Sequence, residues 1–143
     1  QPAQGFTVVA TANTKGKGSD DGRFVGTNVL NEAFLERFPV TFEQQYPSPV
    51  SEQKILELLN PKDDFNKKLV DWADIIRKTF YDGGIDEIIS TRRLVHIVRA
   101  YQIFGNRAKA ITTCISRFDE ETKQAFQELY DKVDADVDFE EKV

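Results

Sequence analysis

The sequence contains no methionine, one cysteine and one histidine among its 143 residues. A single cysteine, Cys114, excludes an internal disulfide framework and fits a reducing compartment, so we expect a cytoplasmic protein. A single histidine, His96, excludes a histidine-rich metal site, and we expect no bound metal ion. No apolar run approaches the roughly 18 residues of a membrane-spanning helix, and no charged-then-apolar leader is present. The composition therefore points neither to secretion nor to a membrane.

Positive charge is also in short supply. The 19 Lys and Arg residues face 24 Asp and Glu residues, which gives a net charge of −5. This balance argues against sequence-independent binding to nucleic acid. With 40% hydrophobic and 30% charged residues, the chain can bury one good core or two small ones. Because it begins at Gln1 and lacks methionine, we expect a piece of a longer protein.

The first 49 residues have the pattern of part of an α/β fold. Residues 6–12 are nearly all apolar or Thr, which is typical of a strand buried on both faces in the middle of a sheet. A Gly-rich loop at 14–27 precedes a short amphipathic helix, which ends at Pro39 because proline cannot continue the hydrogen-bond ladder. Residues 40–43 form a second candidate strand. One or two strands and one helix make an incomplete sheet, so we expect the remnant of an α/β core.

An all-α domain is predicted beyond Tyr46-Pro47-Ser48-Pro49, the strongest domain boundary in the sequence. Apolar residues recur there at helical spacing and predict four to five helices over residues 50–134. From residue 135 to 143 the chain is acidic, which predicts a disordered tail. The longest apolar stripe comprises Phe65, Leu69, Trp72, Ile76 and Phe80.

Helix boundaries in this domain are predicted from capping residues. Ser51, Ser90 and Asp119 are candidate N-caps, because each can accept a hydrogen bond from a free backbone N–H. Asn60-Pro61 has the order of a cap followed by a proline at the first helical position. Gly105 is expected to end the helix that Ser90 begins.

Three polar positions are poorly explained as solvated surface. Asn13 ends the first predicted strand, at the edge of an open α/β sheet where ligands gather. Arg37 lies between an apolar helix face and a proline. Arg92 and Arg93 occupy the first turn of a predicted helix, where a cation opposes the helix dipole. Such a position becomes favourable when an anion binds there. By contrast, His96 lies off the apolar stripe as a surface residue, and Cys114 is predicted to fill a small gap in the core.

The stretches around these positions resemble a known family. Residues 6–14 read Phe-Thr-Val-Val-Ala-Thr-Ala-Asn-Thr, and residues 26–39 read Gly-Thr-Asn-Val-Leu-Asn-Glu-Ala-Phe-Leu-Glu-Arg-Phe-Pro. Both are similar to the second half of a AAA+ ATPase core of the MoxR-like type, especially the cobaltochelatase subunit CobS and the CbbQ/NorQ activators. Ser90-Thr-Arg-Arg-Leu is similar to the start of the sensor-2 helix in the helical lid domain of that family.

The resemblance implies specific roles. Asn13 matches sensor 1, Arg37 matches the arginine finger and Arg92 matches sensor 2. Glu36 departs from the family, which usually has Asp before the finger. The full-length protein would bind ATP and Mg²⁺ and hydrolyse ATP. Its Walker A and Walker B motifs would lie upstream of Gln1, so this fragment alone is expected to be inactive and to hold neither cofactor.

The resemblance also implies a ring, hexameric by analogy, that remodels or activates a client protein. A von Willebrand A-type partner is one candidate client, and neither membrane nor nucleic acid is an expected partner. Two alternatives remain open from the residues. The first is a non-enzymatic helical protein-interaction module, and the second is a AAA+ relative that handles nucleic acid. The client and the roles of Arg23 and Arg93 are not readable from the sequence.

Overall fold

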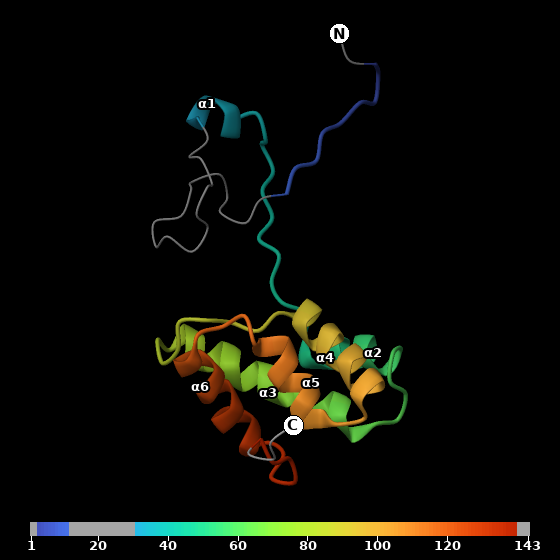
Figure 1. The fold of residues 1–143 in the computed structure, drawn as a ribbon. Helices are drawn as coiled ribbons and strands as arrows, with labels where there is room; N and C mark the ends of the chain where they lie inside the picture. The colour runs from blue at the N-terminus through green and yellow to red at the C-terminus, as the bar shows by residue number, and fades with distance from the viewer. Residues whose placement is uncertain (1–2, 12–30, 140–143) are drawn as a thin grey trace. The chain divides into compact units, whose positions relative to one another are not determined.

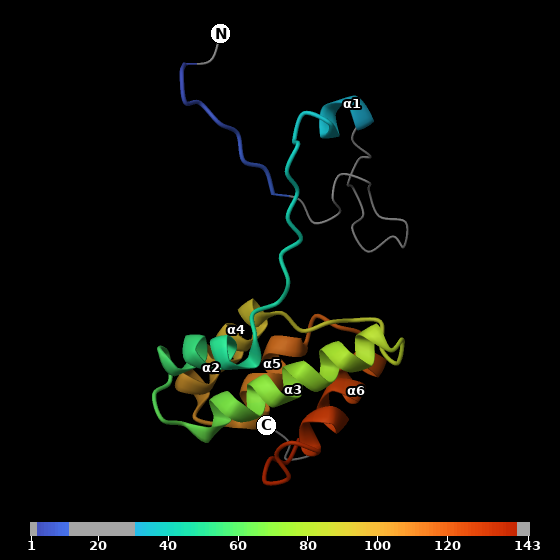
Figure 2. The same ribbon diagram turned by 180° about the vertical axis from the view of Figure 1, so that it is seen from behind.

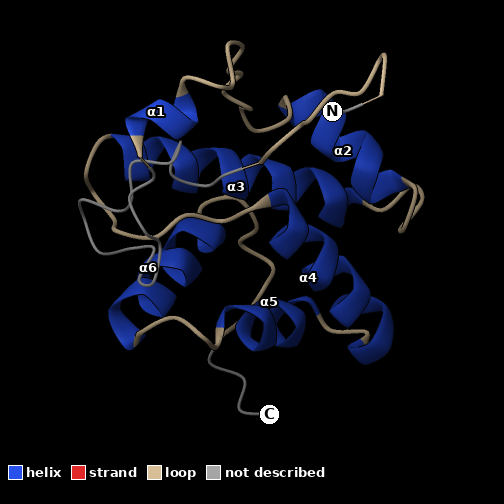
Figure 3. Ribbon diagram, turned by 90° about the horizontal axis from the view of Figure 1, so that it is seen from above, coloured by secondary structure: helices blue, strands red, loops and turns tan. Residues whose placement is uncertain are grey.

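The computed structural model describes residues 3–11 and 31–139. The chain divides into two compact units, residues 1–44 and 45–143, and each is described by itself. All regular secondary structure in the described part of the chain is helical (Figures 1 and 3). Asn13, Arg23 and the predicted Gly-rich loop lie outside the described residues.

The described part of the first unit contains one short helix, α1 (Glu32–Leu35). Its N-cap is Asn31, whose side chain accepts a hydrogen bond from the backbone N–H of Ala33 at 2.8 Å. The rings of Phe34 and Phe38 pack edge to face with their centroids 5.5 Å apart. These local contacts support the helix that the apolar spacing predicts, in a shorter form.

The predicted strands are not shown in this unit. Within the described residues, neither 6–11 nor 40–43 is assigned as a strand. The predicted burial is absent as well, because Val9 is 86% exposed and Phe42 is 89% exposed. A strand requires neighbouring backbone groups as hydrogen-bond partners. The structure therefore supports the all-α part of the expected fold and does not show its α/β part.

Within its described residues, 45–139, the second unit contains five helices, in agreement with the four to five that the apolar stripes predict (Figure 1). The five helices are α2 (Pro49–Glu57), α3 (Asp64–Tyr81), α4 (Thr91–Phe104), α5 (Arg107–Ile115) and α6 (Glu120–Asp131). The longest helix, α3, packs against α2, α4 and α6, and α5 packs against α4 (Figures 1 and 2).

Local capping explains where several of these helices begin and end. The Ser90 hydroxyl accepts a hydrogen bond from the Arg93 N–H at the start of α4, and Asp119 caps α6 in the same way. Both predicted caps are confirmed. Gly105 ends α4 with a φ of 65°, a left-handed conformation that costs glycine little because it has no Cβ.

Two predicted caps are wrong. Helix α2 is capped by Ser48 rather than Ser51, because Pro49 occupies the first helical position and suits the start of the helix. Helix α3 is capped by Asp63, whose Oδ1 accepts the Phe65 N–H at 2.9 Å.

Asn60 has a different role, which explains why it does not start α3. Its carbonyl oxygen accepts a hydrogen bond from Asn66 Nδ2 at 2.6 Å, and so it closes the turn between α2 and α3. Pro61 therefore lies in that turn instead of at the first position of a helix.

The core of the domain forms around the buried face of α3. Trp72 is fully buried, and its indole Nε1 donates a hydrogen bond to the Phe126 carbonyl at 2.8 Å. The Trp72 ring packs edge to face against Phe126 and Tyr130 of α6, with centroids 6.0 and 5.4 Å apart. This one side chain therefore joins α3 to α6 through apolar contact and a hydrogen bond.

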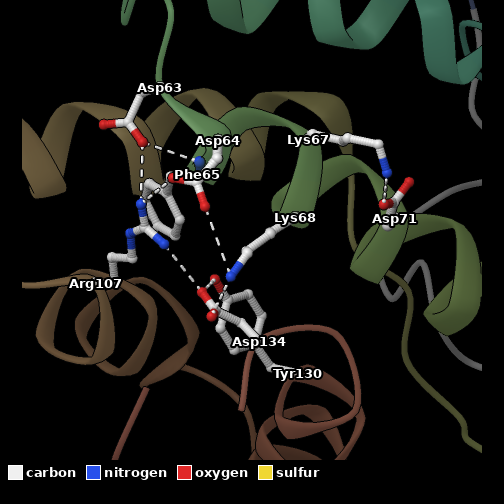
Figure 4. A network of polar contacts seen from close by, with 9 residues as sticks. All are labelled: Asp63, Asp64, Phe65, Lys67, Lys68, Asp71, Arg107, Tyr130 and Asp134. Carbon is white, nitrogen blue, oxygen red and sulfur yellow. Dashed lines mark hydrogen bonds and ion pairs between the residues drawn. The ribbon is translucent and has the colours of Figure 1, made fainter. Parts of the chain in front are cut away.

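A polar network fastens the segment after α6 to the helices (Figure 4). The side chain of Asp134 is fully buried. It accepts hydrogen bonds from Lys68 Nζ at 2.5 Å, from Arg107 Nη1 at 3.2 Å and from the Tyr130 hydroxyl at 3.0 Å. Lys68 belongs to α3 and Arg107 to α5, so one carboxylate joins three elements of the domain.

The chain beyond Asp134 keeps contact with the domain as far as it is described. Val137 and Phe139 are partly buried against the core. The Phe139 ring lies edge to face with Tyr130 at a centroid distance of 5.9 Å. Two residues of the predicted tail, Val137 and Phe139, therefore pack against the domain.

Replacing Trp72 tests the core. We expect Trp72→Ala to lower the free energy of unfolding by about 3–5 kcal/mol, because it removes a fully buried ring and opens a cavity. Tyr81→Ala is the control on the same helix, since Tyr81 is 70% exposed, and it should change little. Urea unfolding followed by circular dichroism measures both. An unchanged midpoint for Trp72→Ala would contradict the placement of Trp72 in the core.

Replacing Asp134 tests the polar network. Burial by itself raises the pKa of Asp134, but the hydrogen bonds from Lys68 and Tyr130 outweigh it and hold that pKa below its usual value. A lowered pKa means that the contribution to stability is present above about pH 4 and is lost as the pH falls through the folded-state pKa. Asp134→Asn should cost about 2–3 kcal/mol at neutral pH and should flatten the acid side of the stability profile.

Asp71→Asn is the matched control in the same view (Figure 4). Asp71 pairs with Lys67 at 2.6 Å on an exposed part of α3, where an ion pair contributes below about 1 kcal/mol. Urea unfolding at several pH values compares the two variants. Equal losses of stability would show that Asp134 is no more important than a surface carboxylate.

Candidate functional site

The structure describes two of the three predicted site residues, each within its own unit. Arg37 is the second residue after the short helix α1 and is exposed. Its backbone N–H donates to the Phe34 carbonyl at 3.2 Å. Arg92 lies in the first turn of α4 and is also exposed. The two arginines belong to different units, and Asn13 lies outside the described residues.

The start of α4 is an unusual setting for a cation. The first turn of this helix contains no acidic residue, although carboxylates are the side chains that the positive end of a helix dipole favours. Arg92 and Arg93 stand there instead. An exposed guanidinium at a helix N-terminus, together with the free N–H groups of the first turn, suits an anionic ligand.

Arg93 is committed to the fold, which distinguishes it from its neighbour. It is half-buried, and its Nη1 donates a hydrogen bond to the Cys114 carbonyl of α5 at 2.9 Å. Burial, and secondly the nearby charge of Arg117, lower the pKa of Arg93 from its usual value. Arg93 therefore joins α4 to α5, and Arg92 is the arginine that remains exposed.

The segment that leads into α4 rests on a buried ion pair. Arg77 of α3 donates from Nη1 and Nη2 to the two carboxylate oxygens of Glu52 of α2, at 2.8 and 2.9 Å. Arg77 Nε donates to the Ile89 carbonyl at 3.1 Å. The Thr91 hydroxyl donates to Glu52 Oε1 at 2.5 Å. Residues 89 and 91, on either side of the Ser90 cap, are thus bonded to α3 and α2.

This ion pair was not predicted from the sequence, although the sequence carries a signal for it. Glu52 lies one helical turn before the buried Leu56, and Arg77 directly follows the buried Ile76. A charged residue in the phase of a buried stripe is costly unless it is paired. One residue of each sign in this position indicates a partner, but local spacing does not identify which residue it is.

The two other candidate side chains, Cys114 and His96, do not have the surroundings of a reactive or metal-binding group. Burial raises the pKa of the Cys114 thiol, which disfavours the reactive thiolate, and Cys114 packs partly buried against the core. His96 is exposed. No group of three or more His, Cys, Asp or Glu side chains that could hold a metal ion occurs within residues 3–11 and 31–139. Over the same ranges, no helix is long and apolar enough to cross a membrane.

The all-α fold of the second unit is consistent with the helical lid domain that the sequence resemblance implies. The CbbQ/NirQ/NorQ C-terminal family matches residues 52–133, which is more than half of the chain, and the chain belongs to this family. The predicted resemblance to the C-terminal portion of a MoxR/CobS/CbbQ-type AAA+ protein is confirmed.

A longer relative supports the same assignment. The chain is 27% identical over 139 residues to the aerobic cobaltochelatase subunit CobS of Sinorhizobium sp. The match covers 92% of this chain and 42% of that protein, so the chain spans less than half of the curated relative. No solved structure matches the chain.

Replacing the two neighbouring arginines separates their roles. We expect Arg93→Gln to lower the free energy of unfolding by about 1–2 kcal/mol, because a half-buried bond between α4 and α5 is lost. Arg92→Gln should stay within about 0.5 kcal/mol of the parent, as exposed substitutions do. Thermal and urea unfolding measure both variants. A larger loss for Arg92→Gln than for Arg93→Gln would reverse the assignment.

Proposed function

We propose that this chain is the nucleotide-responsive C-terminal portion of a cytoplasmic AAA+ ATPase that remodels or activates a partner protein. The observation that carries the proposal is the family match over residues 52–133, with the exposed Arg92 in the first turn of a helix inside the matched region. The longer CobS relative supports it, because its similarity extends over nearly the whole chain.

Arg92 acts as sensor 2 in this proposal. A guanidinium offers planar paired N–H donors that fit phosphate oxygens, and its charge is not lost at physiological pH. The first turn of α4 adds the positive end of the helix dipole. Arg92 therefore binds the γ-phosphate in its own subunit and makes the orientation of the helical domain depend on the nucleotide.

Asn13 and Arg37 act on the chemical step. Phosphoryl transfer is catalysed mainly by positioning and by charge stabilisation. The amide of Asn13, as sensor 1, orients the attacking water without acquiring a charge. Arg37 is the arginine finger and reaches the nucleotide of the neighbouring subunit, a contribution worth about 10³–10⁵ in rate where it has been measured. A finger that acts in trans requires a ring, which we take to be a hexamer.

ATP and Mg²⁺ are bound mainly by a part of the protein that precedes this chain. The Walker A backbone cradles the phosphates, and an acidic Walker B residue helps to hold the metal ion. This chain contributes arginine and amide groups that respond to the bound nucleotide. The client is a protein, with a von Willebrand A-type partner as one candidate, and no described residue selects a particular client.

Substituting Arg37 tests the proposal. In the longer protein, Arg37→Ala should leave folding and nucleotide binding nearly intact and should remove most ATP turnover. The reason is that the guanidinium is used only as charge develops on the neighbour's γ-phosphoryl group. Steady-state ATPase kinetics and nucleotide titration separate turnover from binding. Arg117→Ala is the control, because Arg117 is exposed at the end of α5.

Mixing subunits tests the action in trans. Arg37→Ala subunits are combined with subunits disabled at their own phosphate loop. Some interfaces then pair an intact finger with an intact nucleotide site, and partial turnover should return. Mixed rings that stay as inactive as either parent at every ratio would rule out a trans-acting finger. The alternative, a non-enzymatic interaction module, predicts no dependence on Arg37 at all.

A further inference from the structure

We propose that Glu52 and Arg77 are positioning residues for Arg92. The inference rests on the proposed function, in which Arg92 binds phosphate. The buried ion pair bonds the residues on either side of the Ser90 cap, and Arg92 is the second residue after that cap. The pair thereby sets the direction in which α4 starts and the point in space from which the Arg92 side chain extends.

The cost of burying the pair argues against a purely stabilising role. Glu52 is 1% exposed and Arg77 is 8% exposed. Removing two such charges from water costs about as much as their attraction returns, and apolar residues of similar volume are commonly as stable or more so. If contact between α2 and α3 were the only requirement, a pair of apolar side chains would meet it.

The direction of the bonds shows what the ion pair adds. An apolar pair could pack α2 on α3, but it could neither donate to the Ile89 carbonyl nor accept from the Thr91 hydroxyl. Arg77 and Glu52 do both while they remain bonded to each other. Hydrogen bonds have preferred angles, so these contacts restrict the backbone of residues 89–91 more closely than apolar packing would.

Tyr46 connects the same pair to the beginning of the second unit. The guanidinium carbon of Arg77 lies 4.2 Å from the centre of the Tyr46 ring, within the range of a cation–π contact. Tyr46 stands two residues inside the boundary between the units, which falls after Gln44. Arg77 of the ion pair therefore contacts both the first residues of this domain and the segment that leads into α4.

The first arm of the test measures local order in the 143-residue chain. Glu52→Leu combined with Arg77→Met replaces the pair by apolar residues. Thr91→Val removes only the hydroxyl, and Thr91→Ser keeps it. Asp74→Asn combined with Lys78→Gln is the control, because this i,i+4 pair lies 2.7 Å apart on the exposed side of the same helix. Hydrogen exchange reports on the Arg93 and Leu94 amides, which both donate to the Ser90 carbonyl.

We expect the apolar double variant to keep the urea midpoint of the parent or to raise it. Its Arg93 and Leu94 amides should nevertheless exchange about tenfold faster, while Val98 in the middle of α4 stays unchanged. Thr91→Val should give the same local effect, Thr91→Ser should restore protection, and the control should change neither amide. The inference would be overturned if amide exchange became uniformly faster along the whole of α4. It would also be overturned if exchange became faster in neither Thr91→Val nor the apolar double variant. If the double variant fails to fold, the two Thr91 variants decide alone.

The second arm measures ATP turnover in the longer protein. The apolar double variant and Thr91→Val should change KM and kcat for ATP in the same sense as Arg92→Ala, and should add nothing when combined with it. If Arg92→Ala alone has no effect, the proposed role of Arg92 fails, and the exchange result still decides whether the pair orders α4. If Arg92→Ala has an effect and the other variants have none, the positioning role fails by itself.

Discussion

The helical unit depends on the burial of one face of α3. Trp72, at the middle of this face, contacts α6 through two rings and a backbone hydrogen bond. The same helix carries Arg77, which reaches α2, and Lys68, which reaches the segment after α6. Apolar area supplies most of the favourable free energy of such a core. Helices α2, α4 and α6 pack against this one element, and α5 packs against α4.

Two buried carboxylates then restrain the positions of backbone segments that apolar packing alone would restrain less closely. Glu52 is bonded by Arg77 and Thr91, and Asp134 by Lys68, Arg107 and Tyr130. The first network supports the start of α4, where the exposed Arg92 stands. The second fastens the chain after α6 to α3 and α5. In the proposed function the helical domain responds to nucleotide as one body, and directional bonds between its helices suit that requirement.

The helices were predictable from the sequence because their signals are local. Apolar spacing predicts the five helices of the second unit, and Ser90, Asp119 and Gly105 mark three helix ends correctly. The start of α3 was misplaced because Asn60 has a suitable side chain but uses its carbonyl to close the preceding turn.

Long-range pairs were not predictable, since 25 residues separate Glu52 from Arg77. The predicted strands at 6–12 and 40–43 depend on neighbouring backbone groups, which no local pattern supplies. Arg92 was predicted as a candidate site residue because a cation matches the helix dipole poorly there, whereas Glu52 and Arg77, which bond to the residues around the start of α4, were not predicted.

In the proposed mechanism, two arginines of this chain bind phosphate in different subunits. A structure of the longer protein bound to Mg²⁺ and a non-hydrolysable ATP analogue would test this. We expect the Arg92 guanidinium within hydrogen-bond distance of the γ-phosphate in its own subunit, and the Arg37 guanidinium at the γ-phosphate of the neighbouring subunit. Both arginines in solvent, with every nucleotide site occupied, would contradict it.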